Sequence, residues 1–303
     1  MRYIDDISKI KLNNTVVTIG KFDGNHVGHQ LLFKTALELK EYAMDSVILS
    51  FDDRIFDLSN DKRNIFSESE KNSNDIYEKF DYLIRLDFNE IKDMYPEEFV
   101  EKILVKKLGV KKIVVGNDFC FGKDRMGDIR TLYDLGEIFK YEVFALEKIR
   151  YDGVDVSSTR IKDEILKGNF FKVNQMLGKP FSITGEIVKG KQIGKTIGFP
   201  TINVDYDEKK ILPPDGGYAT IVVIDGERFQ SITNIGKNPT VNGEKRTVEA
   251  HIFDFDKDVY GKTAKIEFYK YLRPEEKFDS LEELKKEIEK NKQEVIEYFK
   301  SMS

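Results

Sequence analysis

Two histidines lie three residues apart in a glycine-rich turn near the start of the chain, in the run Thr15–Gln30, TVVTIGKFDGNHVGHQ. The run opens with β-branched residues, as a buried strand does, and from Val27 it continues with helical apolar spacing. A strand, a glycine turn and a helix N-terminus together form a geometry that binds phosphate. His26 and His29 share one side of the first helical turn. We therefore expect both imidazoles to face a ligand there.

The imidazole pair has two chemical interpretations. The rings can donate hydrogen bonds to phosphate oxygens that gain negative charge in a transition state. Alternatively, the i,i+3 spacing can supply two zinc ligands, for which Cys120 and His251 are the only other soft candidates. The chain has only three histidines, and two of them lie in this turn. We favour a functional pair over a structural one, and phosphate handling over zinc.

A cluster of hydroxyl and basic side chains follows at Val156–Lys162, VSSTRIK. Ser157, Ser158 and Thr159 supply three hydroxyls, and Arg160 adds a positive charge at an expected helix start, which suits a chain of phosphates. The same hydroxyls are also an ordinary N-cap cluster. The cluster therefore indicates a phosphate site only in combination with the histidine turn.

The run Gly190–Asn203, GKQIGKTIGFPTIN, interleaves glycines with Lys191 and Lys195. Such a loop can surround phosphates with backbone N–H groups, although its spacing does not match a P-loop and a glycine-rich β-turn is the alternative. Thr201 and Asn203 lie two residues apart, on one side of an extended strand. Their neutral oxygens suit a magnesium ion held mostly by substrate phosphates and water.

A carboxylate lies inside the strand-like run Thr247–Phe253. Strand alternation puts Glu249 and His251 on one face. A glutamate in such a strand either faces solvent or acts as a general base, and the residue pattern leaves both interpretations open. For His251 we expect a structural role.

The first half of the chain alternates short apolar strands with helices, as parallel sheets covered on both faces do. Ligands bind at the carboxyl ends of such strands, and the loops Gly20–Gly24 and Gly116–Gly122 follow two of them. We interpret the polar stretch Asp52–Lys79 as a surface excursion. The expected strands are Thr15–Ile19, Ser46–Phe51, Tyr82–Asp87, Lys111–Val115 and Glu142–Leu146, and the expected helices are Gly28–Tyr42, Pro96–Leu108 and Asp128–Phe139.

The second half is expected to be an all-β unit, a sheet or a barrel, closed by one long amphipathic helix from about Ser280 with a capping box to Glu283. We place the boundary near Gly178–Phe181, so the predicted domains are residues 1–180 and 181–303. The expected strands are Ser182–Lys189, Tyr218–Ile224, Ser231–Ile235, Thr247–Phe253 and Ala264–Tyr269.

Composition excludes several classes of protein. Over 303 residues the formal net charge is −5, so we expect no nucleic-acid partner held by a global basic field. No run approaches the roughly 18 apolar residues of a membrane span, so no membrane partner is expected. One cysteine excludes an internal disulfide, and the N-terminal residues lack the apolar middle of a secretory signal. We predict a cytoplasmic protein and leave self-association open.

In this order, GKFDGNHVGHQ, GNDFCFG and VSSTRIK resemble the adenylyltransferase half of the bifunctional bacterial riboflavin kinase/FAD synthetases. The resemblance implies a Rossmann-like nucleotidyltransferase domain with a parallel sheet, in which the FMN phosphate attacks the α-phosphorus of ATP and pyrophosphate leaves. It implies that His26 and His29 stabilise the ATP phosphates. It also implies nucleotide-binding roles for Gly20, Phe22, Gly24, Asn117, Asp118, Ser158, Thr159 and Arg160.

Five motifs of the second half, GFPTIN, NIGKNPT, the glutamate before FDF, Tyr260-Gly261 and LRPE, resemble the riboflavin kinase module. The resemblance implies a small antiparallel barrel with a terminal helix, in which ATP phosphorylates the terminal ribityl hydroxyl. Glu249 would take the proton of that hydroxyl, and Thr201 and Asn203 would hold Mg²⁺. Further implied roles are ATP binding by Gly194, Lys195, Gly198 and Pro200, and flavin binding by Arg273.

The expected protein is thus a two-domain enzyme that makes FMN from riboflavin and FAD from FMN, with ATP and Mg²⁺ at both sites and small molecules as its partners. The chain departs from the family pattern at Asp52–Ile55, where Pro-His-Pro is usual, and at Cys120 and Lys162, where arginines are usual. If these departures inactivate the first half, the protein is a riboflavin kinase only. A non-enzymatic flavin- or nucleotide-binding regulator is the second alternative.

Overall fold

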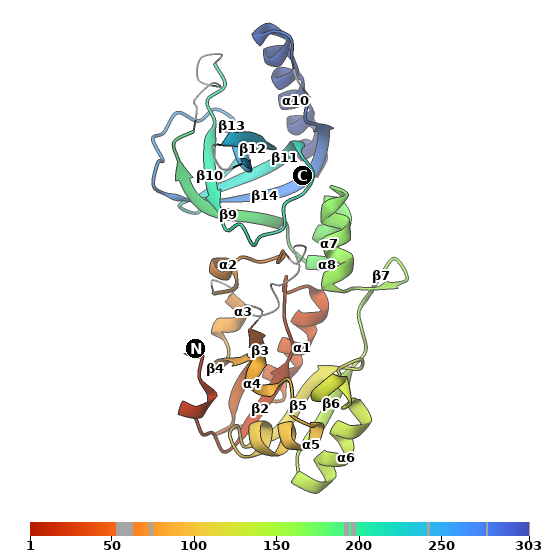
Figure 1. The fold of residues 1–303 in the computed structure, drawn as a ribbon. Helices are drawn as coiled ribbons and strands as arrows, with labels where there is room; N and C mark the ends of the chain where they lie inside the picture. Colours follow the sequence, from red (N-terminus) through yellow and green to blue (C-terminus); the bar gives the residue numbers. More distant parts are fainter. Residues whose placement is uncertain are drawn as a thin grey trace. The chain divides into compact units, whose positions relative to one another are not determined.

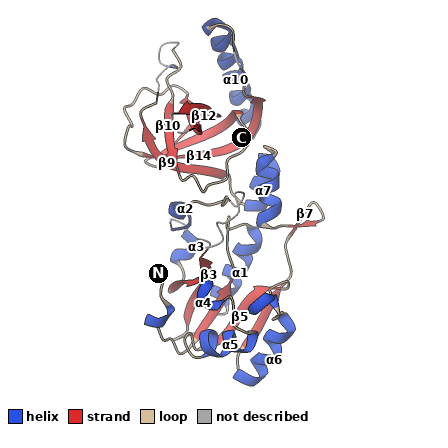
Figure 2. Cartoon of the chain, in the orientation of Figure 1, coloured by secondary structure: helices blue, strands red, loops and turns tan. Residues whose placement is uncertain are grey.

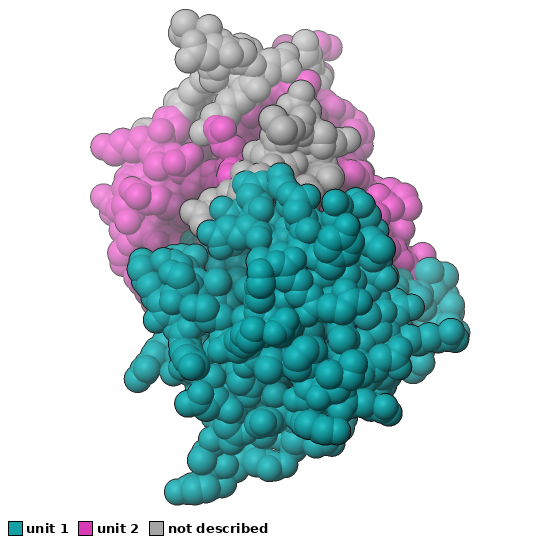
Figure 3. Space-filling model, turned by 60° about the horizontal axis from the view of Figure 1, so that its bottom comes forward, with its two compact units in different colours: residues 1–62, 69–157 teal, residues 63–68, 158–303 magenta. Residues whose placement is uncertain are grey.

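The computed structural model describes residues 1–52, 63–72, 75–190, 194, 198–240, 243–276 and 278–302. The chain divides into two compact units (Figure 3). Unit 1 comprises Met1–Lys62 with Ser69–Ser157, and unit 2 comprises Arg63–Glu68 with Ser158–Ser303. The chain therefore passes into unit 2 for a short segment, returns to unit 1, and enters unit 2 again at Ser158.

In the described part of unit 1, six parallel strands form one sheet in the order β1-β4-β3-β2-β5-β6 (Figures 1 and 2). The predicted parallel sheet is confirmed. The sequence missed β1, a three-residue edge strand whose side chains are mostly exposed, so that it carries no apolar run. The strands are β1 (Arg2–Ile4), β2 (Thr15–Ile19), β3 (Asp45–Asp52), β4 (Tyr82–Asp87), β5 (Val110–Gly116) and β6 (Glu142–Leu146).

Helices cover both faces of the sheet because alternate residues of each strand point to opposite sides. On one face, Val17 and Ile113 belong to a core with η3 and α6; on the other, Val16 and Val114 pack with α1 and with the aromatic ring of Phe80. Both cores are apolar and fully buried, as a doubly covered parallel sheet requires. The helices are η1 (Ile7–Lys9), α1 (Val27–Glu38), α2 (Glu68–Asn72), α3 (Asp75–Glu78), α4 (Phe88–Ile91), α5 (Pro96–Phe99), the π-helix η3 (Val100–Val105), η4 (Lys123–Arg125) and α6 (Ile129–Phe139).

The ends of two helices show how local sequence sets their limits. Helix α6 begins where predicted, because Asp128 and Thr131 form a reciprocal capping box. Helix α1 ends at Glu38, one turn before the predicted end at Tyr42. The chain then reaches β3 through a turn in which Ala43 has a φ of 59°.

Unit 2 is a closed antiparallel barrel with the strand order β10-β13-β12-β11-β14-β9 (Figure 1). The expected barrel is confirmed. Strands β11 to β14 are longer than predicted, β9 is shifted by one residue, and β10 was not among the predicted strands. The strands are β9 (Phe181–Val188), β10 (Ile202–Tyr206), β11 (Gly216–Ile224), β12 (Glu227–Thr240), β13 (Gly243–Ile252) and β14 (Thr263–Pro274). A small hairpin of β7 (Arg150–Tyr151) and β8 (Val154–Asp155) precedes the unit in the chain.

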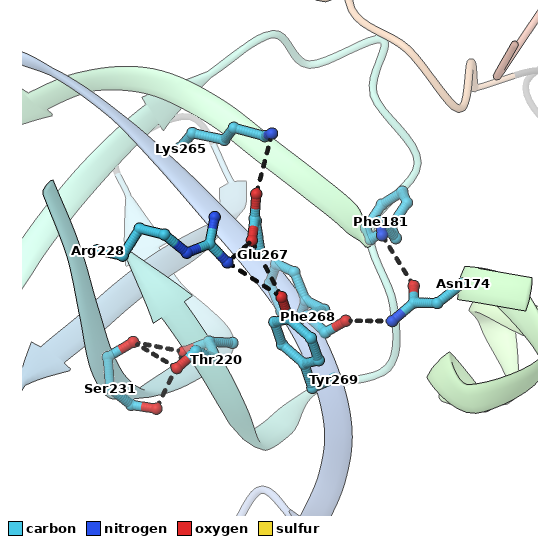
Figure 4. Close-up of polar contacts among 9 residues, drawn as sticks. All are labelled: Asn174, Phe181, Thr220, Arg228, Ser231, Lys265, Glu267, Phe268 and Tyr269. Atoms are coloured by element: carbon cyan, nitrogen blue, oxygen red, sulfur yellow. Dashed lines mark hydrogen bonds and ion pairs between the residues drawn. The ribbon is translucent and has the colours of Figure 1, made fainter. Parts of the chain in front are cut away.

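Two short helices, α7 (Ser158–Leu166) and α8 (Phe170–Leu177), belong to the same unit. Asn174 of α8 accepts a hydrogen bond from the Phe181 N–H (2.8 Å) and donates one to the Phe268 carbonyl (2.9 Å), and so joins the helix to β9 and β14 (Figure 4). Helix α8 packs on strands β9 and β14 of the barrel, and α7 contacts α8. The predicted boundary at residues 180 and 181 therefore stays a prediction.

The long helix α10 (Leu281–Met302) packs Val295 and Phe299 on the outer face of the barrel, against residues that include Ala219 and Ile232. Ser280 accepts a hydrogen bond from the Glu283 N–H, as a capping box predicts, but the Glu283 carboxylate accepts from the N–H of the preceding Asp279. The terminal helix thus begins where the sequence placed it.

The segment Arg63–Glu68, which we call the strap, belongs to unit 2. Its backbone pairs with residues 209–211, and the Lys210 Nζ donates to the Ile65 carbonyl at 2.6 Å. Ile65 is fully buried and Phe66 nearly so. The predicted surface excursion over Asp52–Lys79 is therefore wrong at the strap, because two apolar side chains bury here. Residues 53–62 and 73–74 of that stretch lie outside the described residues.

Candidate active sites

The strand order of unit 1 has a switch point between β2 and β5. After β2 the chain builds β3 and β4 on one side, and it then returns to build β5 and β6 on the other. Ligands of open parallel sheets bind in the crevice at the carboxyl ends of the strands beside such a point. The turn Gly20–Gly24 follows β2, and Asn117 and Asp118 follow β5. The structure therefore brings these two predicted loops to the same edge of the sheet, after neighbouring strands.

The two histidines form the N-terminus of α1. His26 is the N-cap residue, and its Nδ1 accepts the backbone N–H of His29 at 3.4 Å. The two rings stack, with centroids 3.6 Å apart and planes 22° apart. A Cβ atom on Gly28 would lie 3.1 Å from two atoms of the His26 ring, closer than such contacts normally are. Glycine between the histidines therefore lets the His26 ring lie over the first helical turn.

Strained backbone precedes the histidines. The φ angles of Phe22, Gly24 and Asn25 are 53°, 84° and 43°, and a non-glycine residue adopts such values at a cost of about 1–3 kcal/mol. The Phe22 ring is buried, with its edge toward the His29 ring at 5.3 Å, and a Cβ on Gly20 would lie 3.0 Å from it. Phe22 thus supports His29 by packing, and the contact with ATP that the sequence predicts for it would come from its backbone.

Both histidines are neutral near pH 7. Burial lowers the pKa of the His26 imidazole to about 4, and the nearby Asp23 carboxylate opposes this shift. The pKa of His29 is held well below its usual value, by burial first and by the neighbouring His26 second. Because His26 Nδ1 accepts a hydrogen bond, the proton of this ring is on Nε2. Neutral rings can still donate one hydrogen bond each to an anion.

Several buried polar atoms around the turn lack a hydrogen-bond partner among the described residues. They are Thr18 Oγ1, Asn25 Oδ1 and His29 Nδ1. Buried polar atoms in native proteins are nearly always satisfied, so such a group of atoms indicates a missing ligand. The atoms lie on β2, on the turn after it and on the first turn of α1, where a phosphate would bind.

The loops after β5 and β6 are paired with each other. Asn117 Nδ2 donates to Glu147 Oε2 at 2.7 Å, and the Asp118 carboxylate lies 2.7 Å from Lys148 Nζ. The sequence missed Glu147 and Lys148, although both follow the carboxyl end of a predicted strand. Cys120, in the same loop, makes one weak hydrogen bond from Sγ to the Asp118 carbonyl at 3.6 Å. The structure thus holds Asn117 and Asp118 in place at the crevice.

The third predicted phosphate-binding group belongs to the other unit. Ser158, Thr159 and Arg160 form the first turn of α7, which is part of unit 2. The helix start that the hydroxyl cluster predicted is confirmed. Nucleotide binding by these three residues stays a prediction.

In unit 2, strand register puts six positions in one row across the barrel, which we call the barrel row. Register partners share one face, and their Cβ atoms lie about 4.5–5.5 Å apart. The row consists of Val188 (β9), Asn203 (β10), Glu249 (β13), Asn234 (β12), Gly217 (β11) and Arg273 (β14). The expected metal ligand Asn203 and the expected base Glu249 are therefore direct neighbours.

The barrel row lies on the outer face of the barrel. Val248 and Ala250, on either side of Glu249, are buried in the interior, so Glu249 points the other way. Arg273 is three strands from Glu249, about 14 Å at the usual strand spacing. Gly217 between Asn234 and Arg273 has no side chain. Within the row, Asn234 and Gly217 therefore lie between the expected base Glu249 and Arg273, and Gly217 is buried. Sequence reasoning left Asn234 out of the site, because only the register shows that it is a neighbour of Glu249.

The glycine loop before β10 contacts the same row. A Cβ on Gly190 would lie 2.2 Å from Asn203 Nδ2, so glycine makes room for the Asn203 side chain. The Gly194 carbonyl accepts the N–H of Phe199 at 2.8 Å. Lys191 and Lys195, which the sequence predicts to face phosphates, lie outside the described residues.

His251 fixes the end of this loop. Its Nδ1 donates to the Pro200 carbonyl at 2.9 Å, and its ring meets the Phe199 ring edge-on at 5.2 Å. Pro200 immediately precedes Thr201. His251 therefore has the structural role that the sequence predicts, at a point next to the expected metal ligand.

No group of three or more histidine, cysteine or acidic side chains able to hold a metal ion occurs within the described ranges. The neutral oxygens of Thr201 and Asn203 fit a magnesium ion that takes its other ligands from phosphates and water, because Mg²⁺ commonly keeps several waters and needs few protein groups.

Two family models match the chain: FAD synthetase over residues 8–160 and riboflavin kinase over residues 177–299. A bifunctional riboflavin kinase/FMN adenylyltransferase of Bacillus subtilis (strain 168) is 33% identical to it, over 95% of this chain and 93% of the relative. The chain belongs to this family. The FAD synthetase match includes the histidine turn and ends at Arg160, and the riboflavin kinase match includes every position of the barrel row.

A second relative and a solved structure show similar coverage. The bifunctional riboflavin kinase/FMN adenylyltransferase of Escherichia coli (strain K12) is 32% identical over 99% of this chain and 97% of the relative. A crystal structure from Streptococcus pneumoniae, described as a macrolide-efflux protein, has a TM-score of 0.85 and 30% identity, covering 96% of this chain and 97% of that one. In this chain, none of the helices among the described residues is both long and apolar enough to cross a membrane.

Proposed function

We propose that the protein makes both flavin cofactors: unit 2 phosphorylates riboflavin to FMN with ATP, and unit 1 transfers AMP from a second ATP to FMN, releasing pyrophosphate and forming FAD. The observation that carries this proposal is that each matched family model falls on a unit whose geometry supplies the groups its reaction needs. The partners are small molecules, and the cytoplasmic location follows from the sequence prediction.

In unit 2, Glu249 acts as the general base. The terminal ribityl hydroxyl of riboflavin loses its proton to the Glu249 carboxylate, its oxygen bonds to the γ-phosphorus of ATP, and ADP leaves. Thr201 and Asn203, the register partner of Glu249, would hold a magnesium ion, and such an ion would neutralise charge on the phosphates. The loop from Gly190 to Pro200 supplies backbone N–H groups to the phosphates.

In unit 1, the reaction needs no base. The FMN phosphate is already ionised near pH 7, so one of its oxygens can attack the α-phosphorus of ATP directly while pyrophosphate leaves. His26 and His29, neutral and stacked, donate hydrogen bonds to oxygens that gain charge as the bond breaks. The N-terminus of α1 adds its backbone dipoles. Catalysis here is electrostatic and depends on rings held in place before the substrate arrives.

Two parallel incubations test the proposal. Purified protein receives ATP and Mg²⁺ with either riboflavin or FMN, and the flavins are separated by chromatography. We expect FMN and then FAD from riboflavin, and FAD from FMN. FMN without FAD would remove the adenylyl half of the proposal and leave a riboflavin kinase. Tight flavin binding with neither product would replace the proposal with a flavin-binding regulator.

A further inference from the structure

We infer that Asn291 and Glu287 of helix α10 are positioning residues that hold the Arg273 guanidinium toward riboflavin, so that the terminal helix forms part of the flavin site. This inference rests on the proposed function of unit 2 and on the predicted role of Arg273. It assigns a binding task to a helix that otherwise only covers the barrel.

A buried amide carries the inference. Asn291 is polar yet only 2% exposed. Its Oδ1 accepts from Arg273 Nε at 2.9 Å, and its Nδ2 donates to Glu287 Oε1 at 2.8 Å. The same Glu287 oxygen lies 3.7 Å from Arg273 Nε. An amide, a carboxylate and a guanidinium thus satisfy one another in a small network between β14 and α10.

The network fixes the arginine without using all of its donors. Nε binds Asn291, Nη1 donates to the Pro274 carbonyl at 3.1 Å, and the guanidinium lies 5.5 Å from the centroid of the Phe278 ring. Among the described residues, Nη2 makes no hydrogen bond. A planar guanidinium held on one side keeps its remaining donors in a fixed direction. Arg273 is therefore ready to bind an acceptor on a ligand.

The position of the network in the barrel row indicates which ligand atoms Arg273 would bind. Gly217 is the register partner of Arg273, and a Cβ there would lie 3.6 Å from Arg273 Cγ and 3.7 Å from Asn291 Oδ1. The side chains of Arg273 and Asn291 thus lie over the buried Gly217, on the Arg273 side of the row. If the hydroxyl of riboflavin lies at Glu249, the flavin ring extends toward Arg273. The carbonyl oxygens of the ring are acceptors for its free donors.

Fixing the arginine before binding favours affinity. A long side chain that is free in solution loses rotamer freedom when it contacts a ligand, whereas one that is already held loses little. The network therefore acts on riboflavin binding and not on the chemical step. This gives it a kinetic signature: a change in the KM for riboflavin with little change in kcat.

The first variant is Asn291→Leu, which keeps the volume and removes the acceptor and the donor. We expect the KM and the Kd for riboflavin, the latter from flavin fluorescence, to rise about tenfold. The kcat, the KM for ATP and FAD formation from supplied FMN should stay within twofold of wild type. If wild type forms FMN and the KM of Asn291→Leu for riboflavin is unchanged, the inference is wrong and the proposed function stands. If wild type itself forms no FMN, the proposed function is wrong.

A charge exchange provides a test that retains the packing. Asn291→Asp alone places a carboxylate 2.8 Å from that of Glu287 and should raise the KM for riboflavin about tenfold. In the double variant Glu287→Gln/Asn291→Asp, the carboxylate at position 291 accepts a hydrogen bond from Arg273, and the amide at position 287 donates one to that carboxylate. The KM for riboflavin should therefore return to within about twofold of wild type. If the double variant binds riboflavin as poorly as Asn291→Asp, the network is not what positions Arg273.

Val295→Ala is the matched control, because Val295 lies on the same helix, is fully buried and belongs to the packing core of α10. It should lower the thermal stability of the riboflavin kinase activity and leave the KM for riboflavin unchanged. If it raises this KM as much as Asn291→Leu does, the network only holds the helix in place and the inference is wrong.

Discussion

In the proposed reactions both the histidine turn and the barrel row act on ATP, and the two sites are built differently. In unit 1 the chemistry lies within one short stretch, from Gly20 to His29, and is buried at a helix N-terminus. In unit 2 the proposed groups in the barrel row are Asn203, Glu249 and Arg273, which come from strands β10, β13 and β14 and lie on an outer face. The first site is made by local backbone geometry, and the second by strand register. A local site can be recognised from neighbouring residues, whereas a site made by register appears only when the strands are paired.

The difference extends to the reactions. The acceptor in unit 1 is a phosphate that needs no deprotonation, so neutral donors on a rigid turn are sufficient. The acceptor in unit 2 is a hydroxyl, and a hydroxyl needs a base within hydrogen-bond reach. Glu249 fits this need because it is a direct neighbour of Asn203. If this comparison is correct, each reaction can be removed without the other.

The largest effect is expected for Glu249→Gln, which keeps the shape of the side chain and removes the base. Riboflavin phosphorylation should fall about 10³-fold, since a positioned general base contributes roughly 10²–10⁴-fold. FAD formation from supplied FMN should not change. Initial rates with each flavin measure both. A comparable loss of FAD formation in a folded variant would mean that the two sites are not separate.

The next effect is expected for His29→Ala, which should lower FAD formation from FMN about 10²-fold, in the range found when one transition-state donor is removed. Riboflavin phosphorylation should continue at the wild-type rate. His251→Ala is the matched control, because it removes the third imidazole of the chain from the other unit. It should leave FAD formation unchanged. Equal losses of FAD formation in both variants would contradict the assignment of His29.

Much of this comparison could be predicted from the sequence, for reasons that differ between the units. The strand before the histidines and the helix after them were readable because apolar periodicity is local, and the glycine between the histidines marks a close approach. The parallel sheet was predicted from the alternation of strands and helices in the first half, and the barrel from the succession of strands in the second half. The family resemblance supported both predictions. The proximity of Asn234 to Glu249 could not be predicted, because it depends on the pairing between β12 and β13.

The strap shows a second limit of sequence reasoning. It lies in a polar stretch, and only two apolar residues distinguish it from a surface loop. Its burial depends on residues 209–211, which are distant in the chain. Asn291 is a similar case: on a helix with many charged residues it looks like a surface position, yet it is buried beside Arg273. Neither feature has a local signal.

Ile65→Ala tests whether the strap supports unit 2. Ile65 is fully buried, and removing such a side chain typically destabilises a protein by about 2–5 kcal/mol. Riboflavin phosphorylation should therefore be lost at a lower temperature than in wild type, while the inactivation temperature of FAD formation stays nearly unchanged. The control is Ile48→Ala, which removes an equally buried side chain from the sheet of unit 1 and should have the reverse effect. If Ile65→Ala destabilises FAD formation first, the strap belongs functionally to unit 1.

The smallest effect is a pH dependence of the stability of unit 1 that comes from its two histidines. The pKa of His26 falls from 6.5 in the unfolded chain to about 4 in the folded one, so between these values the unfolded state binds more protons. The free energy of unfolding of unit 1 is then highest above pH 6.5 and falls as the pH drops toward 4, by at most about 1.4 kcal/mol per pH unit for this histidine. The shift of His29 has the same sign.

Amide hydrogen exchange in β2, which is fully buried beside the turn, measures this stability by mass spectrometry. Comparing wild type with His26→Gln at each pH cancels the intrinsic pH dependence of exchange. The amide side chain introduced by this substitution does not titrate, so the protection of wild type relative to the variant should decrease steadily from pH 6.5 to pH 4.5. The barrel strand β11 should show no such trend. A constant ratio of protection in β2 would mean that burial does not hold His26 neutral. The proposed adenylyl transfer, which uses neutral imidazoles as hydrogen-bond donors, would then be wrong. An imidazolium at a helix N-terminus is a different catalyst from the neutral ring.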